Sequence, residues 1–211
     1  MQGIDLRQAA ARAVFCRLLA GCYYEPGPEF VEEKLFGSML DLAVQIEPQL
    51  ATSARRLGEA FFEQSAESLL IDYTRLFLGP NHILANPYGS FWIEREHGLM
   101  QDSTMAVQAL YAEGGFELDD DFHELPDHIA VELEFLYLLL HDEAESVHHA
   151  DAAALAAVRA LRGRFLGAHL GRWAGPFTVA LAAGAQSDFY RELAGITGHF
   201  LGILTRIPEH A

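Results

Sequence analysis

Apolar residues recur at three- and four-residue intervals along almost the whole chain, the spacing of one face of an α-helix. The first apolar stripe runs from Leu6 to Cys22, and the helix-stopping sequence EPGP at residues 25–28 follows it. Further helices are predicted over residues 30–46, 49–62, 69–78, 102–114, 126–149, 151–170, 176–185 and 188–205. We find no sustained two-residue alternation, so the pattern predicts an all-α domain of about nine or more helices and no sheet.

One segment interrupts the helical pattern. Residues 79–95, GPNHILANPYGSFWIER, combine two prolines, two glycines and two asparagines with a group of large apolar side chains. A loop longer than about 12 residues is uncommon in a compact domain and is often functional. We therefore predict an aromatic loop here, whose rings either fold onto the core or form part of a binding surface.

An acidic connector divides the chain. Residues 117–125, ELDDDFHEL, carry five acids, and we interpret them as a hinge. The N-terminal half then comprises residues 1–116, including the aromatic loop, and the C-terminal half comprises residues 126–211. Pro126 is placed at the first position of the helix that follows, where its missing N–H costs nothing.

The charge balance is strongly acidic. Thirty acids against 14 bases give a formal net charge of −16, which disfavours nucleic acid and favours basic partners. Between Arg95 and Arg159 the chain has 15 acids and no lysine or arginine. This window fits a surface that recruits cations, and it equally fits a general bias towards solubility.

Signatures of catalysis are missing from the sequence. There is no GxGxxG after a strand, no GxxxxGK[ST] and no GxSxG, so we predict a protein that is not an enzyme and has no cofactor. Cys16 and Cys22 are expected to be buried free thiols. Without a secretory leader or a run of about 18 apolar residues, we expect a cytoplasmic protein with no membrane insertion.

Histidines raise the alternative of a helical metal-binding protein. His141, Glu145 and either His148 or His149 share one helix face, and His128 precedes Glu132 by four residues. The chain has no HExxH and no paired Glu-x-x-His motifs. A solvated helix face is the favoured interpretation of residues 141–149, and no metal site is predicted.

The Asp127–His128 pair stands at the predicted hinge and at a predicted helix start. An aspartate in the first turn is favoured by the helix dipole, so it could simply cap the helix beside a partly buried histidine. The alternative is a polar cluster at the mouth of a groove between the halves, in which carboxylates hold an arginine in two parallel hydrogen bonds.

Several linked motifs occur in one order along the chain. They are YTRLFLGP at residues 73–80, PYGS at 87–90 with Trp92, LMQDST at 99–104, and ELPDH at 124–128 with Glu132, Glu134 and Phe135. In these motifs and their spacing the chain resembles the TorD/DmsD/NarJ family of chaperones for molybdenum-containing redox enzymes, and it looks nearest to the TorD and DmsD branches.

The resemblance implies a TorD-like all-α fold, present as a monomer or as a homodimer that exchanges halves at the hinge. It also implies a system-specific chaperone that binds the twin-arginine signal peptide of an apo-molybdoenzyme and assists molybdopterin insertion before export. Tyr73, Phe77 and Tyr88 match aromatic positions of the family's peptide groove, and Pro126, Asp127 and His128 match its hinge-side motif. Asn81 and Gln101 depart from the family pattern, which affects partner specificity.

A twin-arginine leader has a basic start and an apolar middle, so it needs both carboxylates and rings. We hypothesise that Asp127, with Glu124 or Glu132, meets the arginines. The predicted lining of the apolar part is Tyr73, Phe77, Tyr88 and Trp92. The alternatives are a metal-binding protein, as above, and a structural interaction subunit without chaperone activity.

Overall fold

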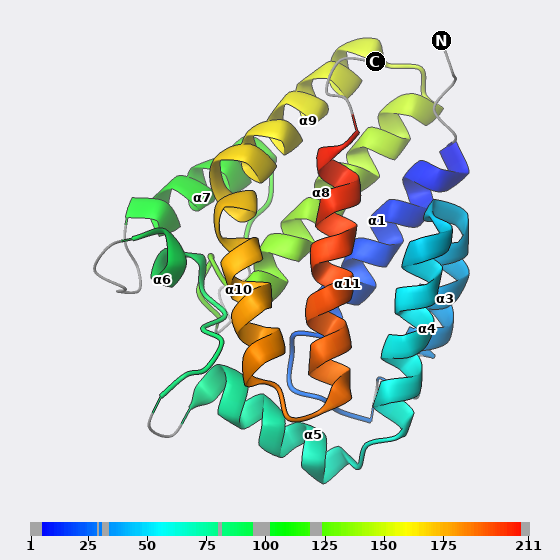
Figure 1. Ribbon diagram of the computed structural model, residues 1–211. Helices are drawn as coiled ribbons and strands as arrows, with labels where there is room; N and C mark the ends of the chain where they lie inside the picture. The colour runs from blue at the N-terminus through cyan, green and yellow to red at the C-terminus, as the bar shows by residue number, and fades with distance from the viewer. Residues whose placement is uncertain are drawn as a thin grey trace.

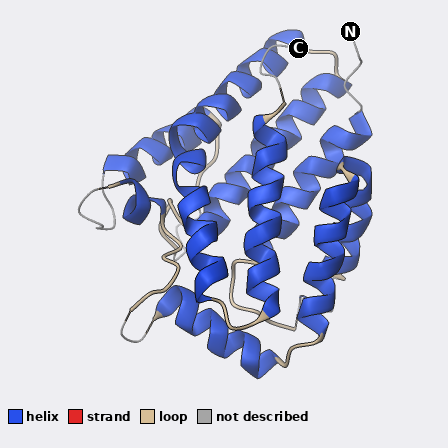
Figure 2. Ribbon diagram, viewed as in Figure 1, coloured by secondary structure: helices blue, strands red, loops and turns tan. Residues whose placement is uncertain are grey.

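The computed structural model describes residues 6–28, 30, 34–79, 82–94, 102–118 and 124–207 (Figure 1). Helices joined by loops make up this part of the chain, as Figure 2 shows, and its one β-type contact is an isolated antiparallel bridge between Tyr88 and His128. The prediction of an all-α fold is confirmed.

The α-helices are α1 (Leu6–Gly21), α3 (Leu35–Ile46), α4 (Pro48–Phe62), α5 (Ala66–Tyr73), α6 (Gly89–Ile93), α7 (Asp102–Glu113), α8 (Ile129–His148), α9 (Ala152–Phe165), α10 (Gly171–Gly184) and α11 (Asp188–Thr205). Two π-helical turns, η1 (Thr74–Leu78) and η2 (Leu166–Leu170), extend α5 and join α9 to α10. Most predicted helices agree with these bounds to within a few residues, and α11 agrees at both ends.

Side-chain caps explain several of the helix starts. The hydroxyl of Ser65 accepts a hydrogen bond from the Ser68 amide at the start of α5, and Ser187 plays the same part for α11. The Asp151 carboxylate accepts from the amides of the first turn of α9. These side chains satisfy amides that have no partner within the helix, which fixes where each helix begins.

Three sequence predictions were wrong in detail. The aromatic loop contains a short helix, α6. Pro126 lies in a turn, because α8 begins only at Ile129. Pro176 lies inside α10 rather than at its start. The break before α10 is instead η2, where the helix axis changes direction (Figure 1). A Cβ at Gly171 would overlap the Leu166 carbonyl, so this wide turn requires a glycine there.

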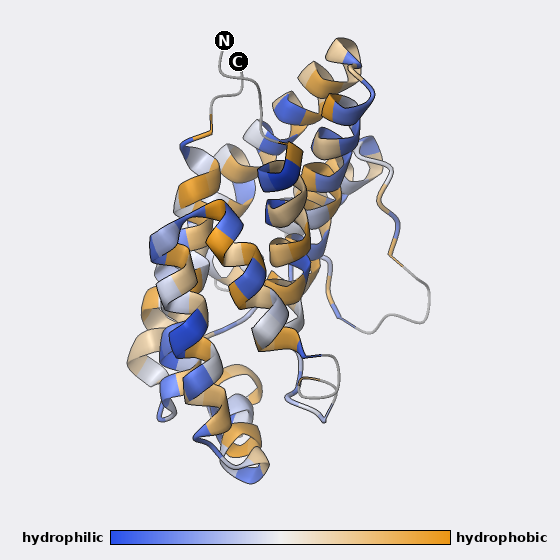
Figure 3. Cartoon of the chain, turned by 90° about the vertical axis from the view of Figure 1, so that its right-hand side faces the viewer, coloured by the Kyte–Doolittle hydropathy of each residue, from blue (hydrophilic) through white to orange (hydrophobic). Residues whose placement is uncertain are grey.

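The helices of the two predicted halves share one hydrophobic core. α1 packs along α8, and α4 packs against α11, which also contacts α10 (Figure 1). The rings of Phe15 and Phe200 lie 4.9 Å apart between α1 and α11, and Trp173 is fully buried. Figure 3 shows hydrophobic and hydrophilic residues interleaved along the helices, the pattern expected when each helix buries one face.

The predicted division at residues 117–125 stays a prediction, because residues 119–123 lie outside the described part of the chain. Cys16 and Cys22 are buried free thiols, as predicted. Within the described residues, no helix combines the length and apolar character needed for a bilayer crossing.

Asp72 ties α5 to the turn before α11. This side chain is 2% exposed, and its Oδ2 accepts hydrogen bonds from the amides of Gln186 and Ser187 at 2.9 and 2.8 Å. The Ser187 hydroxyl donates to the same oxygen at 2.9 Å. Arg75 pairs with Oδ1 at 2.6 Å, so both carboxylate oxygens have donors.

Replacing this carboxylate should be costly. We expect Asp72→Ala to lower the free energy of unfolding by about 2–4 kcal/mol, because the buried amide and hydroxyl of Ser187 and the partly buried amide of Gln186 lose their acceptor. Urea unfolding followed by circular dichroism measures the change. The matched control is Asp41→Ala, an exposed aspartate on α3; a loss no larger than that of the control would contradict this role for Asp72.

Candidate functional site

The aromatic loop is hydrogen-bonded to the chain just before α8. The Asp127 carbonyl accepts from the Gly89 amide at 2.8 Å, and the Pro87 carbonyl accepts from the Ile129 amide at 2.8 Å. The Asp127 carboxylate is 0% exposed, and its Oδ2 accepts from the Ser90 amide at 2.8 Å. Asp127 therefore anchors the loop and does not cap the helix, which was one of the two interpretations that the sequence left open.

His128 is the residue that caps α8. Its Nδ1 accepts a hydrogen bond from the Ala130 amide at 3.2 Å, and its ring lies between two tyrosines. The Tyr24 ring is stacked at a centroid distance of 6.3 Å, and the Tyr88 ring meets it edge-on at 5.3 Å. Burial lowers the pKa of His128 to about 4, although Glu124 and Asp127 act in the opposite direction. The imidazole is therefore neutral at physiological pH.

Each of these tyrosines donates to a glutamate. The Tyr88 hydroxyl lies 2.8 Å from Glu124 Oε2, and the Tyr24 hydroxyl lies 2.8 Å from Glu134 Oε1. Burial, and then the carboxylates, raise the pKa of both phenols. Burial and Glu124 also raise the pKa of Tyr73 to about 12, so Glu124 lies close enough to influence all three phenols.

These residues form one group around the start of α8. We call it the tyrosine–glutamate cluster, and its members are Tyr24, Tyr73, Tyr88, Glu124, His128 and Glu134. Both glutamates are partly exposed, whereas Asp127 behind them is buried. The cluster thus presents carboxylates and aromatic rings together, held by a loop and a helix start.

A second, fully buried polar group lies under the loop. Glu132 is 0% exposed; its Oε1 is 2.7 Å from His169 Nε2, and its Oε2 accepts from Trp173 Nε1 at 3.2 Å. Burial raises the pKa of Glu132 to about 7, against the opposing effect of His169. A Cβ at Gly89 would lie 2.8 Å from Trp173 Nε1. Only a glycine lets the loop approach this closely.

The structure therefore brings Tyr73, Tyr88, Glu124 and His128 together. Phe77 is buried among rings, 5.2 Å from Tyr73. Trp92 is partly buried, and its Nε1 donates to the Asn86 carbonyl at 2.8 Å. The Pro126 carbonyl accepts from Tyr111 at 2.6 Å. The other two predicted residues, Asp127 and Glu132, are buried.

Sequence reasoning missed Tyr24 and assigned no role to Glu134. The available signal was weak: Tyr24 lies between the first apolar stripe and the EPGP stop, and Glu134 follows the ELPDH motif by six residues. Asn81 and Gln101 lie outside the described residues. In the described ranges, no group of three His, Cys, Asp or Glu side chains could hold a metal; Glu145 and His149 form only an exposed pair at 3.4 Å.

Comparisons with known proteins show the family of this chain. The model of the nitrate reductase delta subunit family matches residues 45–179. The Tat proofreading chaperone DmsD of Salmonella typhi is 29% identical over 182 residues, which cover 86% of this chain and 82% of that protein. The chaperone protein TorD of Vibrio parahaemolyticus is 35% identical over 88 residues, 40% of each chain.

A crystal structure from Archaeoglobus fulgidus, provisionally assigned as a redox enzyme maturation protein, has the same fold. It aligns with a TM-score of 0.52 and 20% identity over 98% of this chain and 97% of that one.

The family match extends over more than half of the sequence, so the chain belongs to the nitrate reductase delta subunit family. With relatives named as DmsD and TorD chaperones, the predicted class of redox-enzyme maturation chaperone is confirmed. Because those relatives are chaperones and not catalysts, the prediction of a protein that is not an enzyme is confirmed as well.

The Glu132 network predicts a specific pH dependence. Because its folded-state pKa is raised to about 7, the stability that Glu132 contributes is complete below the unfolded-state value of about 4.5 and is lost as the pH rises through 7. Between about pH 6 and 8, the free energy of unfolding of the wild-type protein should fall by about 1 kcal/mol more than that of Glu132→Gln. Urea unfolding at each pH measures these free energies, and an equal change with pH in the two proteins would contradict this assignment. His128, whose pKa is lowered from about 6.5, affects stability only below that pH. It is present in both proteins, so its contribution cancels in the comparison.

Proposed function

We propose that this chain binds the twin-arginine leader of a redox-enzyme precursor through the tyrosine–glutamate cluster. The observation that carries the proposal is the pairing of Glu124 with Tyr88 and of Glu134 with Tyr24 on either side of His128. The DmsD relative is named as a Tat proofreading chaperone, and this name supports a leader as the ligand.

The carboxylates in the cluster suit guanidinium groups. Glu124 and Glu134 each accept a phenol hydrogen bond on one oxygen, and within the described residues the other oxygen accepts no side-chain donor. An arginine could donate to that oxygen in a charge-assisted hydrogen bond. His128 is neutral and so does not oppose an incoming cation, and the charge of Arg17 acts on Glu134 alone of the two glutamates. The net charge of −16 adds long-range attraction.

Asp127 takes a different part in this proposal from the one the sequence suggested. Its fully buried carboxylate holds the loop that carries Tyr88, so it positions the cluster while Glu124 and Glu134 face the arginines. The rings of Tyr73, Tyr88 and Trp92 are proposed to contact the apolar part of the leader, with Phe77 and Glu132 supporting them from beneath.

The remaining steps of the proposed chaperone function rest on the family resemblance. The chain is proposed to act in the cytoplasm, to hold the apo-form of a molybdopterin-dependent enzyme until its cofactor is inserted, and to delay export until then. A division of the chain at residues 117–125 would allow the halves to exchange in a dimer, and it is proposed on the same footing.

Binding of a synthetic leader peptide tests the proposal. We expect Glu124→Gln/Glu134→Gln to weaken binding of an Arg-Arg leader about tenfold at low salt, because two charge-assisted pairs are lost. The salt dependence of the dissociation constant should shrink as well. Isothermal titration calorimetry measures both quantities, with a Lys-Lys leader as the second ligand.

The charge-matched control is Asp41→Asn/Glu67→Gln, which removes two exposed acids from α3 and α5 and should leave leader binding unchanged. Asp127→Asn should lower stability through the loop anchor yet keep the salt dependence of binding. If the cluster variant bound the leader like wild type at every salt concentration, the electrostatic part of the proposal would fail.

A further inference from the structure

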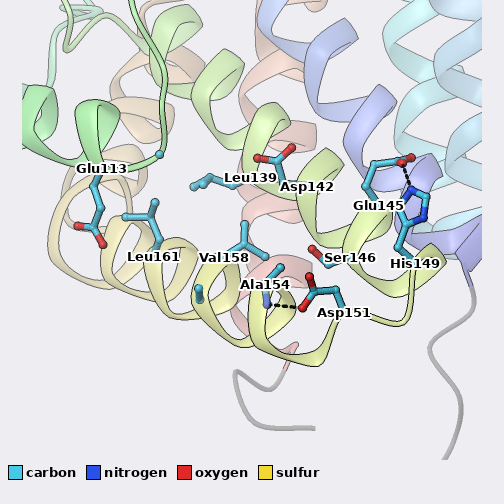
Figure 4. Close-up of a pocket in the computed structure, with 12 residues that line it drawn as sticks. Glu113, Leu139, Asp142, Glu145, Ser146, His149, Asp151, Ala154, Val158 and Leu161 are labelled. Atoms are coloured by element: carbon cyan, nitrogen blue, oxygen red, sulfur yellow. Dashed lines mark hydrogen bonds and ion pairs between the residues drawn. The ribbon is translucent and has the colours of Figure 1, made fainter.

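A cavity of about 590 Å³ lies between the end of α7, the second half of α8, and α9. Figure 4 shows side chains of α8 and α9 along this groove, with Glu113 of α7 at one end and His149 at the other. The groove is separate from the tyrosine–glutamate cluster. Asp142 follows His128 by 14 residues along α8, which corresponds to about 21 Å of helix.

The α9 wall of the groove is small and uncharged. Ala154, Ala157, Val158 and Leu161 line it, and their spacing places them on one helix face. From residue 152 to 161 the helix has a single charged side chain, Arg159, which is 4% exposed and pairs with the buried Glu143 at 2.8 Å. Small side chains let another helix approach closely, so this wall suits a helical ligand.

The α8 wall is acidic. Asp142 and Glu145 line the groove and are exposed. Asp142 has no hydrogen-bond or ion-pair partner within the described residues, and Glu145 faces only His149, at 3.4 Å. The other two acids of the lining are already engaged: Glu113 pairs with Arg164, and Asp151 caps α9. Asp142, and Glu145 beside its exposed histidine, can thus meet cations next to an apolar floor that includes Leu139.

We propose that this groove binds a second segment of the client precursor, outside its leader: an amphipathic helix with arginine or lysine flanking a face of small and medium apolar residues. This inference rests on the proposed function, because it assumes a client held at the cluster. The apolar face would lie on α9 and Leu139, and the cations would meet Asp142 and Glu145. Two separate contacts on one client raise the effective concentration at each.

Charge also identifies the class of occupant. A second copy of this chain would bring another net charge of −16 to a groove that already presents acids, and like charges oppose that contact. A basic segment gains from the same field. The occupant is therefore a basic client segment, and self-association through the groove would overturn this assignment.

A labelled model peptide tests the chemistry of the groove. The probe is a short amphipathic helix with leucine and alanine on one face and arginine on its flanks, and a version with glutamate in place of arginine is the ligand control. Fluorescence anisotropy should show binding of the arginine peptide alone. Asp142→Asn/Glu145→Gln should weaken it roughly tenfold at low salt, and Ala157→Gln should weaken it at least as much by filling the groove.

Two matched variants control for nonspecific effects. Ala156→Gln makes the same change at an exposed neighbouring position, about 100° round the helix and outside the groove lining. Asp41→Asn/Glu67→Gln removes the same charge elsewhere. Both should bind the peptide like wild type. Equal binding by all variants, or no binding at low salt, would overturn the proposal, and so would a dimer in light scattering that the groove variants abolish.

A cross-link on the client itself separates this inference from the proposed function. Cys16 and Cys22 are buried, so a thiol-directed photo-cross-linker reacts selectively with a cysteine introduced by Ala157→Cys. In the complex with a leader-bearing precursor, it should cross-link to a basic amphipathic segment beyond the leader. Cross-linking to the leader instead would overturn a second contact.

The two sites should respond independently. Groove variants should keep wild-type affinity for the leader peptide, and Glu124→Gln/Glu134→Gln should keep wild-type affinity for the model peptide. If the wild-type protein did not bind the leader but formed the groove cross-link, the proposed leader site would be wrong and the groove site would stand. If it bound the leader but formed no groove cross-link, the groove site alone would be wrong.

Discussion

The aromatic loop is held by backbone groups at the start of α8, and the arrangement of the cluster depends on this attachment. Asp127 accepts the Ser90 amide through its carboxylate and the Gly89 amide through its carbonyl, at 2.8 Å each. A buried carboxylate is costly unless it is hydrogen-bonded, and within the described residues only the Oδ2 of Asp127 has a donor, the Ser90 amide of the loop. Tyr88 reaches both His128 and Glu124 only because the loop is fastened there.

Glu132 imposes a second constraint on the same loop. Its bonds to His169 and Trp173 connect α8 with η2 and α10, and the loop passes so close that only glycine fits at position 89. Asp127 thus holds the loop by hydrogen bonds, whereas the Glu132 network limits the side chain that fits beside it. The partly exposed acids, Glu124 and Glu134, remain at the surface, where a cation can reach them. Burial therefore divides acids of similar chemistry into a structural group in the interior and a group that solvent can reach.

The sequence predicted the helices well where local signals agree. Ser187 before an apolar-periodic run locates the start of α11, and the prediction matched both its ends. It failed where a partner distant in sequence decides the outcome. Asp127 resembles a helix cap locally, but Ser90, whose amide donates a hydrogen bond to its carboxylate, lies 37 residues away in the sequence. Tyr24 joins the cluster only because α1 packs along α8, and the groove beside α9 exists only through the angles between helices. Neither feature leaves a periodic trace in the chain.

The wide turn η2 between α9 and α10 determines how α9 is rotated about its own axis relative to α10. A π-turn contains one more residue than the α-helical turn it replaces. In η2 this extra residue lies between α10, which packs in the core, and α9, whose alanine face is exposed. Removing one residue from 166–170 would restore a regular helix and turn α9 by about 100° relative to α10. The alanines would then face a different direction while the core of α10 stayed in register. The same rotation would carry the buried Arg159, Leu161, Arg162 and Phe165 of α9 out of the core, so the length of this turn is fixed by the packing on both sides of it.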